Sequence, residues 1–125
     1  SKYYGVPILM GDNLAQQLGD FAVLPVDRVR VVGRTKGETV HVLLGDQQVR
    51  DSADFIDFAA AHRAMLDAYF RQRWDQAAEI NDRNEQQSTT FGLARLVMLY
   101  RERIIAFAAT PPADGWDGVY EPGSK

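Results

Sequence analysis

The chain of 125 residues contains no cysteine and only two histidines. The absence of cysteine excludes disulfide scaffolds, thiolate zinc sites and cysteine nucleophiles, and it agrees with a reducing compartment. No apolar run approaches the roughly 18 residues that a membrane-spanning helix needs. Lys and Arg total 14 against 17 Asp and Glu, so the sequence also lacks the basic excess that is typical of nucleic-acid-binding proteins.

The remaining composition is that of an ordinary folded protein. Hydrophobic residues make up 46% of the chain, aromatic residues 10% and charged residues 25%. These values predict one globular domain, or two small units that share a core. Because the sequence starts with Ser-Lys-Tyr-Tyr and has neither an initiator methionine nor a leader, we expect it to be a piece of a longer protein.

Residues 1–47 predict a small α+β unit. The apolar run over residues 5–10 predicts a buried strand. Asp12 or Asn13 is placed to cap a following helix of about two turns, which ends at Gly19.

The sequence period then changes to two residues, which indicates strands. A half-buried strand is expected first, bent or interrupted near residues 25–27, where a proline lies. The turn at residues 33–37 and a second strand over 39–44 complete an antiparallel hairpin. The alternating apolar residues that predict the buried face of the first strand are Phe21, Val23, Val29 and Val31.

Residues 48–110 show no strand pattern and predict three helices in an antiparallel, tetratricopeptide-like array. Asp51 or Ser52 is placed to cap the first helix. Its apolar stripe consists of Phe55, Phe58, His62, Met65, Leu66 and Tyr69. The fold class expected for the whole chain is therefore α+β, with a short antiparallel sheet and one small helix followed by this array.

The second and third helices have weaker patterns. The second is expected to start at Trp74 and to decay into the polar stretch 81–88. Thr89 or Thr90 is expected to cap the third helix, which must end before Pro111 because proline cannot continue it.

The junction between the first two helices has the features of a tetratricopeptide-type hairpin. Trp74 is followed three and four positions later by Ala77 and Ala78, whose small side chains allow two helices to approach closely. Asn81 and Asn84 stand where such repeats usually carry apolar residues, which predicts a degenerate second helix.

Residues 111–125 form an arm rich in proline and glycine. The arm also contains Trp116, Val119 and Tyr120, so it either docks on the helices and buries these rings or forms a disordered end. We favour docking, with Trp116 and Tyr120 as the docking residues.

Few side chains are candidates for chemistry. His41 and His62 are expected to be hydrogen-bonded structural residues rather than metal ligands, since neither has further ligands at a suitable spacing. The carboxylates Asp51, Asp54 and Asp57 could hold a cation, but a favourable interaction with a helix dipole explains them better. No catalytic residue and no metal site is predicted.

The only basic cluster lies along the first long strand and the turn after it. It consists of Arg28, Arg30, Arg34 and Lys36. Arg34 and Lys36, beside glycine-flanked backbone amides, are candidate phosphate-binding residues. The alternative, which the residues alone favour, is a solvated strand face and hairpin tip.

Several segments resemble the C-terminal end of the catalytic domain of bacterial class III adenylate cyclases, in the same order of strand, short helix, strand, turn and strand. The helical remainder resembles the C-terminal extension of family members that carry an extracytoplasmic CHASE-type sensor. The segments that carry the resemblance are Lys2 to Leu9, Leu24 to Val31 with Gly33-Arg34, Val40 to Leu44, Trp74 to Ala78, and Pro111 to Tyr120.

The resemblance implies a parent enzyme that converts ATP to cyclic AMP with two Mg or Mn ions, in catalytic domains that pair. In the family, the metal aspartates and the Asn and Arg that support the transition state precede the position of Lys2. Family members commonly have Val-Lys-Gly-Lys or Val-Lys-Gly-Arg at the strand-to-turn junction, and the first Lys contacts the polyphosphate. Here the run is Val31-Val32-Gly33-Arg34, so Val32 replaces that Lys, and only Arg34 or Lys36 could substitute for it.

The leading hypothesis is therefore a C-terminal fragment of an adenylate cyclase. It divides into residues 1–47 from the catalytic domain, a helical extension over 48–110 and an arm over 111–125. The fragment is expected to be inactive by itself, to contain no cofactor, to form a homodimer and to be the cytoplasmic portion of a membrane-bound parent. The alternative is a helical module for protein–protein interaction or dimerisation with no catalytic role.

Overall fold

The computed structural model, which describes residues 1–121, has an α+β fold built on a long β-hairpin. The elements in chain order are β1 (Leu9–Met10), α1 (Asp12–Gln17), β2 (Ala22–Arg30), β3 (Gly37–Gly45), α2 (Gln47–Arg50), α3 (Ala53–Phe70), α4 (Trp74–Arg83), α5 (Glu85–Ser88), the 3-10 helix η1 (Thr89–Phe91) and α6 (Ala94–Ala109). The strands form one antiparallel sheet in the order β1-β3-β2.

Strands β2 and β3 pair from Ala22 opposite Gly45 to Arg30 opposite Gly37. The predicted interruption is a β-bulge, because the register shifts between Pro25 and Asp27. The predicted buried face of β2 is only partly right: Phe21 and Val31, which flank the strand, are 41% and 44% exposed, whereas Val23 and Val29 are partly buried. The helices instead cover the side of the strand that carries Ala22, Leu24 and Val26, since alternate residues of a strand face opposite sides.

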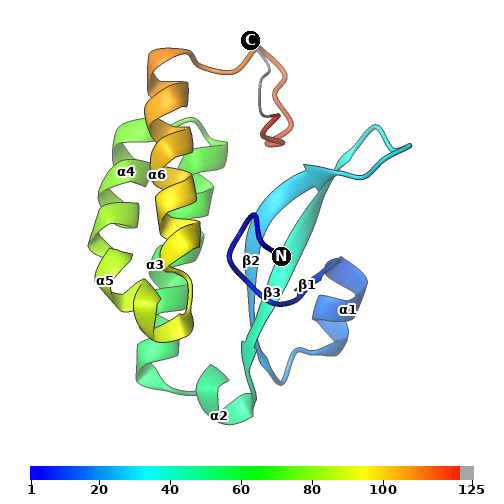
Figure 1. Cartoon of the computed structure of the whole chain (residues 1–125), viewed down its shortest axis with the longest axis vertical. Helices are drawn as coiled ribbons and strands as arrows, with labels where there is room; N and C mark the ends of the chain where they lie inside the picture. The colour runs from blue at the N-terminus through cyan, green and yellow to red at the C-terminus, as the bar shows by residue number, and fades with distance from the viewer. Residues whose placement is uncertain (122–125) are drawn as a thin grey trace.

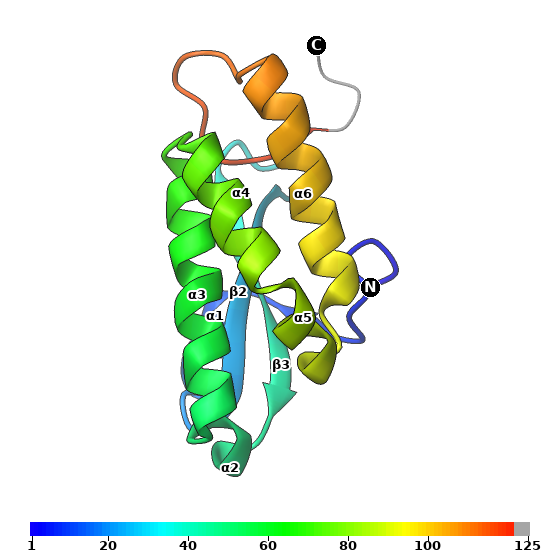
Figure 2. The same ribbon diagram turned by 90° about the vertical axis from the view of Figure 1, so that its left-hand side faces the viewer.

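Helix α4 runs antiparallel to α3 and to α6, and these three helices lie on one side of the sheet, whereas α1 lies on the other side of it (Figures 1 and 2). The predicted start of α3 is confirmed, because the Ser52 hydroxyl accepts a hydrogen bond from the Phe55 N–H at 3.2 Å. The whole predicted apolar stripe of this helix is buried.

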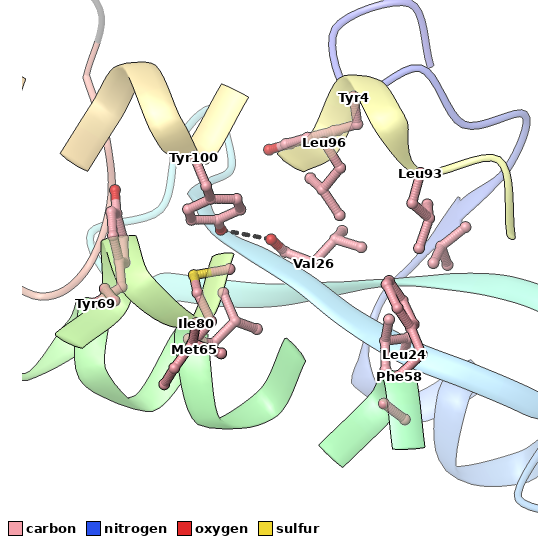
Figure 3. Close-up of a cluster of buried hydrophobic side chains, with 14 of the residues drawn as sticks. Tyr4, Leu24, Val26, Phe58, Met65, Tyr69, Ile80, Leu93, Leu96 and Tyr100 are labelled. Atoms are coloured by element: carbon pink, nitrogen blue, oxygen red, sulfur yellow. Dashed lines mark hydrogen bonds between the residues drawn. The ribbon is translucent and has the colours of Figure 1, made fainter. Parts of the chain in front are cut away.

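The sheet and the helices share one hydrophobic core. Leu24, Val26 and Val42 from the sheet belong to the same buried cluster as Phe58 from α3 and Tyr100 from α6, and Figure 3 shows these layers meeting. The core therefore joins the predicted unit 1–47 to the predicted unit 48–110. Within residues 1–121, no helix combines the length and the hydropathy that crossing a membrane requires.

The first predicted strand is much shorter than expected. Residues 1–8 form turns, and only Leu9–Met10 pairs with β3. Gly5 adopts φ +73°, which is not a strand conformation, and a Cβ there would lie 2.8 Å from the side chain of Arg95. The glycine therefore turns the chain so that its neighbours Tyr4 and Val6 enter the core.

Two predicted helix caps are also wrong. The N-cap of α1 is Gly11, with neither Asp12 nor Asn13 in that role. Thr89 lies in η1 instead of capping α6, which begins after Leu93. Gly92 separates the two helices with φ +70°, a conformation that ends a helical turn and allows the chain to change direction.

The polar stretch 81–88 is largely helical rather than decaying, and three of its residues, Asn81, Asn84 and Ser88, are buried. Asn81 donates to the Val97 carbonyl at 2.9 Å, and Asn84 donates to the Phe58 carbonyl at 3.4 Å. Their amides thus join α4 to its neighbours through hydrogen bonds at positions where an apolar residue was the usual expectation.

Candidate functional site

The outer end of the β2–β3 hairpin, residues Val31–Lys36, is called the hairpin tip here. The Arg34 N–H donates to the Val31 carbonyl at 2.9 Å, and Gly33 between them has φ +84°, a value that glycine adopts without strain. Val32 is 100% exposed. The tip therefore projects beyond the packed body of the protein (Figure 1).

The predicted phosphate-binding residues lie on this tip. Arg34 and Lys36 are both exposed, and the Arg34 guanidinium forms an ion pair with Glu38 at 3.2 Å. Beneath the tip lies an open hollow of about 550 Å³, whose lining includes Arg30, Gly33 and Arg34. The tip thus presents two solvated cations and a backbone turn above a hollow, an arrangement that can contact an anion.

The lining of the hollow also includes Asp27, Arg103 and Tyr4, which form a buried polar cluster with Tyr100. This group of four residues is called the Asp27 cluster. The Arg103 guanidinium donates to both carboxylate oxygens of Asp27, at 2.8 and 3.0 Å, and the two side chains are 3% and 2% exposed. The Tyr4 hydroxyl donates to Asp27 at 2.7 Å. The Tyr100 hydroxyl donates to the Val26 carbonyl at 2.6 Å (Figure 3).

Burial in this cluster changes the ionisation of its members. Burial raises the pKa of Tyr4 and of Tyr100 above the usual tyrosine value, and the Asp27 carboxylate raises both further. Both hydroxyls therefore stay protonated and act as donors at neutral pH. For Arg103, burial opposes the charged form, but the hydrogen bonds to Asp27 outweigh it, so the pKa is raised and the guanidinium stays charged.

The sequence interpretation missed the Asp27 cluster. One signal was present: Arg103 lies in the predicted third helix beside Tyr100, Ile104 and Phe107, which recur at helical spacing. A second was Asp27 itself, a carboxylate inside an apolar strand. Such residues are rarely buried unless they are paired, so each required a partner.

The arm over residues 111–121 docks on the helices and on the hairpin. The Trp116 ring packs against the rings of Tyr69, Trp74 and Phe107, with centroids 5.5, 6.2 and 5.2 Å away. Tyr120 packs edge-on against Phe107 at 5.7 Å. The predicted docking residues thus lie in one aromatic cluster at the ends of α3 and α6. Residues 122–125, also assigned to the arm, lie outside the described residues.

The arm also forms ion pairs with β2 that the sequence interpretation missed. The Arg30 guanidinium binds the carboxylates of Asp117 and Glu121, and Arg28 donates to the Asp117 carbonyl at 3.2 Å. The pKa of Asp117 is lowered: burial acts to raise it, but hydrogen bonds from the Val119 N–H and from Arg30 prevail.

The residues at the predicted helix junction lie between α3, α4 and α6. Ala77 is fully buried, Ala78 is partly buried, and Trp74 stacks on Phe107 with ring centroids 5.1 Å apart. These positions pack the helices together and present little surface to a ligand.

Both histidines are hydrogen-bonded. His41 contacts Asp12 at 2.6 Å and ties α1 to β3, and His62 donates to the Pro25 carbonyl at 2.7 Å. Burial lowers the pKa of His62 to about 4, against the hydrogen bond to Pro25, which acts to raise it.

The acidic residues near the start of α3 have local roles. Asp54 lies in its first turn, and Asp51 binds Arg50 at 2.9 Å. Within residues 1–121, no three His, Asp or Glu side chains form a group suited to a metal ion.

Comparison with known proteins gives no match: no family model fits the chain, and no curated protein and no solved structure matches it.

Proposed function

We propose that this chain is the C-terminal part of a class III adenylate cyclase, an enzyme that makes cyclic AMP from ATP. The observation that carries the proposal is the hairpin tip. The run Val31-Val32-Gly33-Arg34, which resembles the polyphosphate-contacting junction of the family, forms an exposed turn that the other residues among 1–121 leave uncovered. The segments on either side of it, Leu24 to Val31 and Val40 to Leu44, are paired in β2 and β3.

The role proposed for the tip is electrostatic. A polyphosphate carries several negative charges, and cationic side chains near it neutralise charge that develops during transfer. Arg34 and Lys36 have the exposure and the charge for this contact, whereas Val32 has no donor. The metal ligands of the proposed parent would come from residues outside this sequence, so the isolated chain is expected to be inactive.

The decisive experiment extends the protein upstream of Ser1. If the preceding hundred or so residues encode two aspartates at strand ends and an Asn-x-x-x-Arg pair, the longer protein should convert ATP to cyclic AMP with Mn²⁺ or Mg²⁺. The 125-residue chain serves as the blank. Absence of these residues, or a longer protein that folds and makes no cyclic AMP, would refute the proposal.

In the longer protein, two substitutions test the tip itself. Val32→Lys restores the family residue and should lower the KM for ATP, because it adds a cation at an exposed position. Arg34→Gln should raise the KM severalfold, whereas Arg83→Gln, an exposed arginine on α4, should leave it unchanged and serves as the control. Equal effects of Arg34→Gln and Arg83→Gln would contradict a specific contact at the tip.

A second candidate function is self-association through α6. Met98 and Ile105 are 54% and 66% exposed and lie two turns apart on the same side of this helix. Strand exchange along β2 is a poorer route, because α3 side chains already occupy carbonyls of this strand: His62 binds Pro25, and Arg63 binds Val23. Light scattering should show a dimer that Met98→Glu dissociates, and a clean monomer at high concentration would exclude this candidate.

A further inference from the structure

We propose that residues 113–121, called the strap, tether the base of the hairpin tip to the helices, so that release of the strap gives the tip more freedom to move. The inference deepens the proposed function, because the tip is the segment proposed to face the polyphosphate. The physical coupling between strap and tip can be measured without any cyclase activity.

Arg30 is the link between strap and tip. Its Nε donates to the carbonyl of Thr35, which belongs to the tip, at 3.3 Å. Its two other nitrogens bind the carboxylates of Asp117 and Glu121 in the strap. A single guanidinium thus contacts both segments, and its planar fork fixes the relative positions of the three acceptors.

Two glycines allow the strap to approach the hairpin closely. A Cβ on Gly37, the first residue of β3, would lie 2.7 Å from the Val119 side chain. A Cβ on Gly118 would lie 2.9 Å from both Arg28 and Phe70. Val119 is only 8% exposed in this position. The strap is therefore seated between the base of the tip and the end of α3, and it has no space for larger residues there.

The strap is also anchored by aromatic packing, through residues that alternate with its two acids along the chain. Trp116 lies in the aromatic cluster, and its Nε1 donates to the Val119 carbonyl at 2.8 Å, which closes the strap into a turn. Tyr120 lies under the Arg103 guanidinium, 4.4 Å from the ring centroid to Cζ. The anchor is thus largely apolar, whereas the contact with Arg30 is ionic and more exposed: Arg30 and Asp117 are about one third exposed, and Glu121 is about half exposed.

This difference allows the ionic and the aromatic contacts of the strap to respond differently to salt. Salt screens partly exposed ion pairs, since the Debye length is about 10 Å at 0.1 M salt, and leaves buried aromatic contacts largely intact. The ion pairs of Arg30 with Asp117 and Glu121, called the ionic clasp, can therefore open while the aromatic anchor stays docked. Opening the clasp gives the tip more freedom to move without unfolding the protein.

Hydrogen exchange of the backbone amides of residues 34–38 tests the inference. In low salt, Asp117→Asn should raise exchange at these amides roughly three- to tenfold, and Arg30→Gln should raise it at least as much. Asp114→Asn is the matched control, because it removes the same charge from the same segment at an exposed residue away from Arg30. The effect of Asp117→Asn should disappear in 1 M salt.

A steric variant tests the same coupling without a change of charge. Gly37→Ala should displace Val119 and raise exchange at the tip in both low and high salt, whereas Gly11→Ala, where a Cβ meets no atom within 4 Å, should not. Unchanged tip exchange in both Asp117→Asn and Gly37→Ala would overturn the inference. If these variants show that the strap and the tip are coupled but the longer protein makes no cyclic AMP, the inference about the strap stands and only the proposed function is refuted.

Discussion

Two ion-paired residues lie three positions apart on the same strand and differ in almost every physical respect. Asp27 is 2% exposed and is held by Arg103 from α6. Arg30 is about one third exposed and is held by two acids of the strap. Charges in the core cost free energy to desolvate and must stay paired, whereas charges at the surface interact weakly and are screened.

The comparison separates a buried contact that stays closed in the folded protein, called the Asp27 joint, from the surface contact of Arg30, which can open. The Asp27 cluster joins β2, α6 and the N-terminal turn, so opening it would expose the core. The Arg30 contact joins only the tip and the strap, so opening it would leave the core intact. We infer that the helical layer is attached rigidly to the inner part of the hairpin and adjustably to its outer end.

The largest effect is expected at the buried pair. Asp27→Asn keeps the size of the side chain but leaves the Arg103 guanidinium buried without its counter-charge, which should lower the free energy of unfolding by about 3–5 kcal/mol. Urea denaturation followed by circular dichroism measures the change. Asp57→Asn, an exposed position on α3, is the control and should change stability by less than about 0.5 kcal/mol.

Replacing both Asp27 and Arg103 shows whether the loss of stability comes from a buried charge left without its partner or from the lost attraction between the two charges. Asp27→Leu combined with Arg103→Met should be much less destabilising than Asp27→Asn, because neither charge is then left unpaired. A loss below about 1 kcal/mol in Asp27→Asn would contradict the description of this pair as a joint.

The second largest effect is a pH dependence that arises from His62, which is buried beside the bulge of β2. Its pKa is lowered to about 4 in the folded protein by burial, so the unfolded chain binds the proton more readily. Stability from this group is therefore complete above pH 6.5 and falls as the pH decreases toward 4, by about 3 kcal/mol. His62→Gln keeps an N–H for the Pro25 carbonyl and should remove this part of the slope, whereas an unchanged slope would contradict the assignment.

A smaller effect is expected at the anchor of the strap. Trp116→Ala removes an aromatic ring that is only partly buried, so the free energy of unfolding should fall by about 2 kcal/mol, less than for a core tryptophan. Asp114→Ala, two residues earlier in the strap, should have little effect. Equal losses in the two variants would show that the anchor contributes no more than an exposed position.

Local sequence patterns predicted the elements whose residues contact one another at short range. The stripe from Phe55 to Tyr69 is buried as expected, because its helical spacing and the Ser52 cap lie in one segment. Pro25 predicted the interruption of β2 because proline lacks the N–H that a strand needs. The buried face of β2 could not be predicted in the same way, since the position of the helical layer decides which side is covered.

The candidate site depends on partners that are far apart in the sequence. Asp27 meets Arg103 across 76 positions, and Arg30 meets Asp117 across 87. The apolar neighbours of Asp27 and Arg103 in the sequence could have shown that each needs a partner, but no local spacing identifies that partner. The close approach of Val119 to Gly37 also joins residues far apart in the sequence. The need for a glycine at position 37 becomes clear only from the segment that packs on it.

The smallest effect on stability is expected at the ionic clasp. Its dependence on salt and pH is more informative than its size. The pKa of Asp117 is lowered in the folded protein because, although burial acts to raise it, hydrogen bonds from Val119 and Arg30 prevail. Asp117 therefore contributes stability above its unfolded pKa and loses it as the pH falls through the folded value. Asp117→Asn should lower the urea midpoint slightly more than Asp114→Asn at neutral pH and low salt, and the two should coincide in 1 M salt or in strong acid. A difference that persisted in high salt would mean that the Arg30 contact is as fixed as the Asp27 joint, and the contrast between the two ends of the hairpin would be lost.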